Sequence, residues 1–89
     1  MYEKKVVVKA DTGVHARPAM TLVRKATKYK SKINLIKDET EADAKSIMSL
    51  LALAILKGTS ITIRASGEDE QEAVEALWQI IENDFQEIS

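Results

Sequence analysis

The sequence contains no cysteine and one histidine, so it is poor in the side chains that usually bind transition metals. Without cysteine, the chain has neither a disulfide framework nor a thiolate metal site, and one histidine cannot build a multi-histidine site. We therefore expect no metal site and no cofactor.

Long apolar segments are also missing. Residues 1–5, Met-Tyr-Glu-Lys-Lys, lack the apolar stretch of a signal peptide, and the longest nearly apolar run, 47–56, is far shorter than a membrane span. With 89 residues, of which 45% are hydrophobic, the chain is long enough for one modest core. These limits predict a single cytoplasmic domain over residues 1–89 that does not insert into a membrane.

Positive and negative charges are unevenly distributed along the chain, although the formal net charge is only −1. Residues 1–37 hold ten Lys and Arg against two acidic residues, a balance of +8, whereas residues 38–89 hold three against twelve, a balance of −9. The early basic residues on or near one expected helix are Arg17, Arg24, Lys25, Lys28 and Lys30. Their positive field would steer acidic partners to that helix. Nucleic acid is the competing interpretation, but the few aromatic residues do not interleave with the basic ones, so we expect no direct nucleic-acid binding.

Hydrophobic periodicity and turn residues predict seven elements in the order βαββαβα. The expected strands lie at 4–9, 33–36, 40–44 and 61–65, and the expected helices at 16–29, at 47–56 and after Gly67. Each helix has a single apolar stripe, which favours packing on one face of a sheet. The pattern predicts an α+β fold, an open-faced two-layer sandwich whose four-stranded antiparallel sheet is covered on one face by three helices.

Individual segments differ in how their residues suit the predicted elements. The run Val6-Val7-Val8 is typical of a buried strand, whereas 40–44 contains poor strand formers and suits a sheet edge. The 47–56 helix is expected to end at Lys57-Gly58. Residues interpreted as core or half-core on the helices are Met20, the leucines of 47–56, Val74, Leu77, Trp78, Ile81 and Phe85.

Residues 13–19 read Gly-Val-His-Ala-Arg-Pro-Ala and contain the only histidine, His15, at the start of a helical pattern. A neutral imidazole can attack a phosphorus atom, and the guanidinium of Arg17 can hold the oxygens of the captured phosphoryl group. Backbone N–H groups of Ala16 and Arg17 in the first turn would also face these oxygens, whereas Pro18 has no N–H to offer. The alternative is a surface histidine at a helix entrance without any chemistry.

The motif at 13–19 and a second one, Lys45-Ser46-Ile47-Met48, together resemble the HPr family, the histidine-containing phosphocarriers of the bacterial sugar phosphotransferase system. The similarity covers essentially the whole length. It implies that His15 accepts a phosphoryl group from phosphorylated enzyme I and passes it to a sugar-specific enzyme IIA, with Nδ1 as the reacting atom. Such a protein is a carrier in a relay and not an enzyme in its own right.

The second motif resembles the regulatory-serine segment of HPr from Gram-positive-type bacteria. In that branch the serine that corresponds to Ser46 is phosphorylated by an ATP-dependent HPr kinase/phosphorylase. The phosphorylated form then acts with catabolite control protein A as a corepressor. From its position alone, Ser46 is instead an N-cap serine that begins the 47–56 helix.

The resemblance also implies a partner-binding surface around the histidine. Its residues are Met20, Arg24, Lys45, Ile47, Met48 and Leu51, and Thr12 is a further candidate for hydrogen bonding near the site. An exposed methionine beside an isoleucine would form a small adaptable patch that accepts several partners. We expect a small, transient interface and a monomeric carrier.

Glycines that are common in the family are missing at the turn Asp38-Glu39, at Ser49 and at Ala54. Glutamate tolerates a positive φ poorly, so the geometry of that turn is open. Two other functions also stay open. One is a Crh-like regulatory paralogue that uses only the serine; residues 67–73 resemble that branch, although such paralogues lack the histidine. The other is a ferredoxin-like ligand-binding or interaction module without phosphoryl chemistry.

Overall fold

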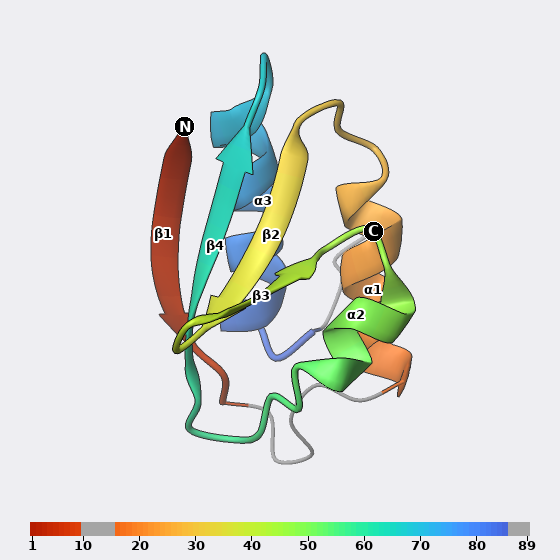
Figure 1. Cartoon of the computed structure of the whole chain (residues 1–89), viewed down its shortest axis with the longest axis vertical. Coiled ribbons are helices and arrows are strands. Elements are labelled where there is room, and N and C mark those ends of the chain that lie inside the picture. The colour runs from red at the N-terminus through yellow and green to blue at the C-terminus, as the bar shows by residue number, and fades with distance from the viewer. Residues whose placement is uncertain (10–15, 86–89) are drawn as a thin grey trace.

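Seven elements follow one another in the predicted order βαββαβα in a computed structural model, which describes residues 1–9 and 16–85 (Figure 1). Most of their bounds agree with the sequence-based ranges to within a few residues. The elements are β1 (Tyr2–Val7), α1 (Ala16–Ala26), β2 (Lys32–Lys37), β3 (Thr40–Asp43), α2 (Ile47–Ala52), β4 (Ser60–Ser66) and α3 (Glu70–Glu82). Within the described ranges, no helix has the length and apolar character needed to cross a membrane.

The strands form one antiparallel sheet in the order β1-β4-β2-β3. The weak third strand lies at an edge, as its composition predicted. In β4, the side chains of Ile61, Ile63 and Ala65 are buried, and the residues between them are exposed or half-buried. The sheet therefore has one face in the core and one face in solvent.

Three helices cover the buried face of the sheet (Figure 1). Helix α3 lies against β1 and β4, α1 packs on α3 and α2, and α2 also contacts β3. The largest fully buried side chains come from both layers and include Leu22, Ile33, Leu35, Leu50, Ile55, Ile61, Ile63, Leu77 and Ile81. The predicted open-faced α+β sandwich is confirmed.

The first strand corrects the sequence-based range 4–9, because β1 spans Tyr2–Val7. Val6 and Val8 are buried, but Val7 between them is 45% exposed on the open face of the sheet. Val8 lies just past the end of β1, where its N–H donates to the Thr59 carbonyl at 2.9 Å and its carbonyl accepts the N–H of Gly58 at 2.7 Å. The run Val6-Val7-Val8 is thus buried only at Val6 and Val8, because no layer covers the outer face of the sheet.

Helix α1 ends at Ala26 instead of Tyr29. The next N–H groups, of Lys28 and Tyr29, donate three residues back at 3.1 Å, which marks a tightening turn rather than a continuing helix. Met20, expected in the core, is 50% exposed.

Helix α2 is much shorter than the expected 47–56, because it ends at Ala52. Leu50, Leu53 and Ile55 are all buried. In a continuous helix, Leu53 would share a face with Leu50, but Ile55 would point about 200° away from Leu53. Leaving the helix lets the chain bury Ile55 in the same core, and this burial overrides the helical propensity of the segment.

Two of the positions at which glycine is common in the family take the left-handed conformation. In the turn between β2 and β3, Asp38 has φ +56, whereas Glu39 does not have a positive φ. Aspartate is one of the few residues that tolerate the left-handed region, so the turn forms without a glycine and without a positive φ at Glu39. Ala54, just after α2, has φ +52, a conformation that disfavours side chains with a Cβ.

A carboxylate fastens the loop after α1 to the start of α3. Asp69 accepts the N–H groups of Lys30 and Ser31, each at 2.9 Å, and the hydroxyl of Ser31. Gly67 allows this approach, since a Cβ there would lie 2.8 Å from the Cα of Ser31. The hydrogen bond from the Ser31 hydroxyl, followed by those from the two backbone N–H groups, lowers the pKa of Asp69 from 3.8 to about 2.

We expect Asp69→Asn to lose stability at neutral pH and to change the acid limb of the stability curve. A carboxylate whose pKa is lowered by folding stabilises the protein above the unfolded value of 3.8, and that stabilisation disappears as the pH falls towards 2. The difference in melting temperature between the wild type and Asp69→Asn should therefore shrink from pH 4 to pH 2, as followed by circular dichroism. Glu72→Gln, an exposed substitution on the same helix, is the control; a constant difference for Asp69→Asn across this range would contradict the expectation.

Candidate functional site

The predicted phosphoryl site falls at the start of α1. His15 and Thr12 lie outside the described residues, and the described part of the site begins at Ala16. Ala16 and Arg17 occupy the first turn and are exposed. The first N–H groups of an α-helix have no partner within the helix, and this first turn contains no acidic side chain. The described side of the site therefore offers donors and positive charge to an anion.

The local sequence explains why the helix begins here. Pro18 belongs to the first turn, where its missing N–H costs no hydrogen bond. The hydroxyl of Thr21 donates to the Arg17 carbonyl at 3.2 Å, so it satisfies its own donor within the helix. Among residues 1–9 and 16–85, no carboxylate pairs with the guanidinium of Arg17. Within the described ranges, no anion therefore competes with a ligand for this guanidinium group.

The exposed and buried residues of α1 lie on opposite faces. Arg17, Met20 and Arg24 follow one another at helical spacing on the exposed side. Ala19, Leu22 and Ala26 are fully buried on the other side. Burial of the small and branched side chains thus leaves a methionine between two arginines on the surface.

Helix α2 adds the apolar part of the surface. Met48 is 73% exposed and Leu51 is 37% exposed, whereas Leu50 points into the core and Ile47 is half-buried against it. Because α1 and α2 contact each other, their exposed residues belong to adjoining elements. Five of the residues that the sequence predicts to bind partners are called the docking surface below: Met20, Arg24, Ile47, Met48 and Leu51.

Ser46 is the N-cap of α2, as its position predicted. It has an extended backbone with φ −120 and ψ 114, and its hydroxyl accepts the N–H of Ser49 at 3.3 Å. The preceding turn is held by Asp43, whose carboxylate accepts the N–H of Lys45 at 2.9 Å and whose carbonyl accepts the N–H of Ser46 at 3.0 Å. The Ser46 side chain is half-buried at the edge of the docking surface.

Two lysines tie down the short helix α2 at both ends. The ammonium of Lys45 donates to the Tyr29 carbonyl at 2.8 Å, so this side chain anchors the start of α2 to the loop after α1. The ammonium of Lys37 donates to the carbonyls of Leu53 at 3.3 Å and Ala54 at 2.9 Å, just past the end of α2. Lys37 was missed by sequence reasoning because the helix was expected to continue to Leu56, which hid the carbonyls that need a donor.

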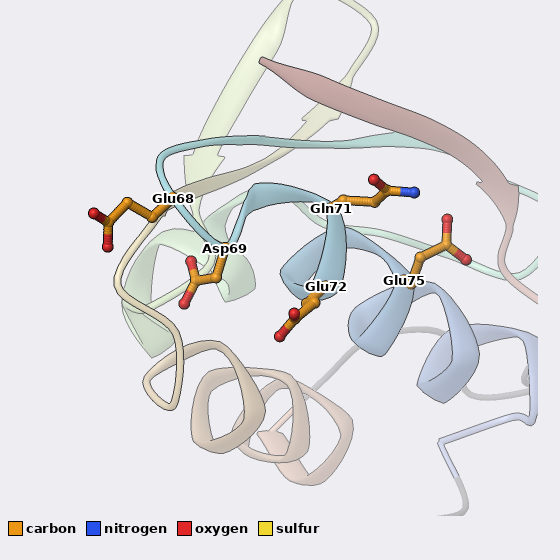
Figure 2. A pocket seen from close by; sticks show the side chains of 5 residues that line it. All are labelled: Glu68, Asp69, Gln71, Glu72 and Glu75. Carbon is orange, nitrogen blue, oxygen red and sulfur yellow. The ribbon is translucent and has the colours of Figure 1, made fainter.

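The negative charge gathers at the start of α3. Figure 2 shows a pocket of about 400 Å³ there, next to the ribbon of α1. It is lined by Glu68, Asp69, Gln71, Glu72 and Glu75. Asp69 is engaged with the loop after α1, and hydrogen bonds from Tyr2 and then Lys4 lower the pKa of Glu75. This pocket repels anions and lies at the end of the molecule opposite the start of α1 (Figure 1).

The described part of the chain contains no group of three or more His, Asp or Glu side chains placed to hold a metal ion. The described part of the site offers exposed guanidinium groups, helix N–H groups and an apolar surface. Such an arrangement can bind a phosphoryl group and an acidic partner together.

Comparison with known proteins identifies the family. The sequence model described as "PTS HPr component phosphorylation site" matches residues 2–83. The chain belongs to the HPr family. HPr proteins are phosphocarriers, and the whole described fold follows theirs: the crystal structure of HPr from Thermoanaerobacter tengcongensis matches with a TM-score of 0.93 and 40% identity, covering 99% of this chain and 100% of that one.

Relatives of two kinds occur within the family. The HPr-like protein Crh of Halalkalibacterium halodurans is 49% identical over 84 residues, covering 94% of this chain and 100% of that one. The phosphocarrier protein HPr of Haemophilus influenzae is 44% identical over 81 residues, covering 91% and 95%. Crh of Bacillus subtilis, crystallised as a swapped, intertwined dimer, matches with a TM-score of 0.77 and 42% identity over 98% of this chain and 100% of that one.

We expect Lys37→Met to destabilise the region around α2. A cation at the carbonyl end of a helix contributes about 0.3–1 kcal/mol, so the free energy of unfolding should fall by about that amount in a urea titration. Amide exchange should accelerate in α2 and at Ala54 more than in β4. Lys32→Met removes an exposed lysine from the same strand and is the control; an equal loss of stability in both variants would show that the contacts to Leu53 and Ala54 contribute nothing.

Proposed function

We propose that this HPr-family protein accepts a phosphoryl group on His15 from phosphorylated enzyme I and passes it to sugar-specific enzyme IIA domains in the cytoplasm. The observation that carries this proposal is the first turn of α1, which follows His15 directly in the sequence. There Arg17 is exposed, and the N–H groups of Ala16 and Arg17 belong to a first turn, where the helix itself provides no acceptor for them. No carboxylate among the described residues pairs with Arg17.

The site favours the phosphorylated state through two effects of different size. The dipole of α1 stabilises an anion at its start by about 0.3–1 kcal/mol. A charge-assisted hydrogen bond from Arg17 contributes more, about 1.5–3 kcal/mol. Arg17 should therefore dominate, and its planar fork can meet two phosphoryl oxygens at once, which a lysine cannot do.

The docking surface fits partners that are acidic around an apolar centre. Arg17 and Arg24 flank Met20 along α1, and Met48 and Leu51 extend the apolar area onto α2. The acidic start of α3 lies away from the start of α1, so the field of the protein orients an acidic partner towards Arg17 at the start of that helix (Figure 1). A small surface of this kind releases each partner quickly, as a relay between enzyme I and enzyme IIA requires.

Substitutions at Arg17 test its role in the transfer. Arg17→Ala should slow phosphoryl transfer by about 10- to 100-fold, because it removes the charge-assisted hydrogen bonds. Arg17→Lys should lose less, because it keeps the charge without the fork. The rate is measured as transfer of labelled phosphate from phosphoenolpyruvate through enzyme I, and His15→Ala should accept no label.

The matched control is Lys5→Ala, which removes a positive charge from the open face of the sheet. Its transfer rate should equal that of the wild type. Equal rates for the wild type, Arg17→Ala and Arg17→Lys would remove Arg17 from the mechanism. Label on the His15→Ala variant would remove His15 as the acceptor.

We further propose that Ser46 is the site at which an ATP-dependent HPr kinase/phosphorylase regulates the carrier. The hydroxyl is half-buried at the edge of the docking surface, one turn from Leu50 and two residues before Met48. A phosphate would add about −1.5 to −2 charges beside a surface that selects acidic partners. Docking of enzyme I would weaken, and catabolite control protein A would be the partner that reads the phosphorylated form.

Ser46→Asp tests this regulation without losing the helix cap, because aspartate is also a good N-cap. Its affinity for enzyme I should fall by about 3- to 10-fold, measured by calorimetry. Ser46→Asn, a neutral residue that caps equally well, is the matched control and should bind as the wild type does. Equal affinities for the Asp and Asn variants would argue against regulation by charge at this position.

The runner-up is a purely regulatory, Crh-like protein, which the 49% identity to the Crh of Halalkalibacterium halodurans favours. Acid-labile label from enzyme I and phosphoenolpyruvate supports the carrier, whereas acid-stable label that requires ATP and the kinase supports regulation alone. No label in either reaction would leave only an interaction module. The protein is proposed to act as a monomer, which sedimentation can distinguish from a swapped dimer.

A further inference from the structure

We propose that Met20 and Met48 form an oxidative modification site, and that converting their thioethers to sulfoxides weakens docking and slows phosphoryl transfer. This inference rests on the proposed function, because it concerns regulation of the same surface. It follows from three features: the sulfur content of the chain, the exposure of these two side chains, and their place on adjoining helices.

The chain offers an oxidant few sulfur atoms. It contains three methionines and no cysteine. Thiolates, which usually react first with peroxides and hypohalous acids, are therefore absent and cannot shield the thioethers. An oxidant that reaches this protein meets sulfur only at Met1, Met20 and Met48.

All three methionines lie at the surface, but only two lie where a partner would bind. Met48 is 73% exposed on α2 and Met20 is 50% exposed on α1, and these helices contact each other. Met1 is 78% exposed at the far end of the molecule, where its terminal ammonium pairs with Glu70 at 2.8 Å (Figure 1). Oxidation of Met1 should therefore have no effect on docking, and Met1 serves as an internal control.

The reaction is a two-electron oxygen transfer from a peroxide. A sulfur lone pair attacks one oxygen of hydrogen peroxide, and an S–O bond forms as the O–O bond breaks. The attacked oxygen gives up its proton, and the second oxygen takes up a proton and leaves as water. Sulfur is oxidised and the peroxide is reduced. The product is a polar sulfoxide in place of a flexible apolar side chain, and reductases specific for methionine sulfoxide reverse it.

Oxidation would act on docking and spare the fold. The core beneath the surface is made by Ala19, Leu22 and Leu50, which are fully buried, while the two methionines face outward. A polar sulfoxide in solvent costs the free protein little. The same group pressed against an apolar partner surface loses its hydration without a partner hydrogen bond, so the cost appears only in the complex.

The test treats the full chain with hydrogen peroxide until mass spectrometry shows the sulfoxides. Transfer of labelled phosphate from phosphoenolpyruvate through enzyme I is then measured at low carrier concentration, before and after treatment of each variant. The transfer rate of the wild type should fall about fivefold or more from its starting value, while its melting temperature stays the same. Treatment with methionine sulfoxide reductases should restore the rate. Met1→Leu should be as sensitive as the wild type, and the double variant Met20→Leu/Met48→Leu should keep its own starting rate after treatment.

Each outcome separates this inference from the proposed function. If the untreated protein accepts no label, the proposed function fails. If the untreated protein transfers phosphate and the fully oxidised protein transfers it equally fast, the modification site is refuted. Loss of rate in the treated double variant, or a lowered melting temperature of the oxidised wild type, would also overturn it, since either would show damage away from the docking surface.

Discussion

One-sided burial is the constraint on which the rest of this structure depends. Every helix has one apolar face, and the sheet has one buried face, so each element hides its branched side chains between the two layers. The side chains that are not buried there lie on the surface. On α1 and α2 they include Arg17, Arg24, Met20 and Met48, so the packing that stabilises the fold also leaves the docking surface exposed.

The fold keeps the acidic start of α3 away from the start of α1 (Figure 1). The basic early half supplies α1, while the acidic late half supplies the start of α3, which lies beside the C-terminal end of α1 (Figure 2). Two of the carboxylates there accept hydrogen bonds that stabilise the fold. Asp69 holds the loop after α1, and Glu75 holds β1 through Tyr2 and Lys4. Acidic groups that would repel a partner are thus kept from the start of α1.

The short helix α2 shows how much the docking surface relies on distant parts of the chain. Six residues are too few to form a stable helix alone. Lys37 from β2 donates to the carbonyls just past its C-terminal end, Lys45 from the preceding turn anchors its start to the Tyr29 carbonyl, and Leu50 anchors it in the core. Sequence reasoning found its N-cap, Ser46, because a cap is a local feature, but it misplaced the C-terminal end, because that end is set by the burial of Ile55.

The sequence by itself determined the element order, the edge position of β3, the helix start that follows His15, and the charge asymmetry, since each depends on neighbouring residues or on periodicity. Only the tertiary structure decided the strand order β1-β4-β2-β3, the early end of α2, the exposure of Met20, and the bonds of Lys37 and Asp69. These features join residues that are far apart in the chain. They are stabilised by burial and hydrogen bonds that form only when the two layers pack together, so no local sequence pattern could predict them.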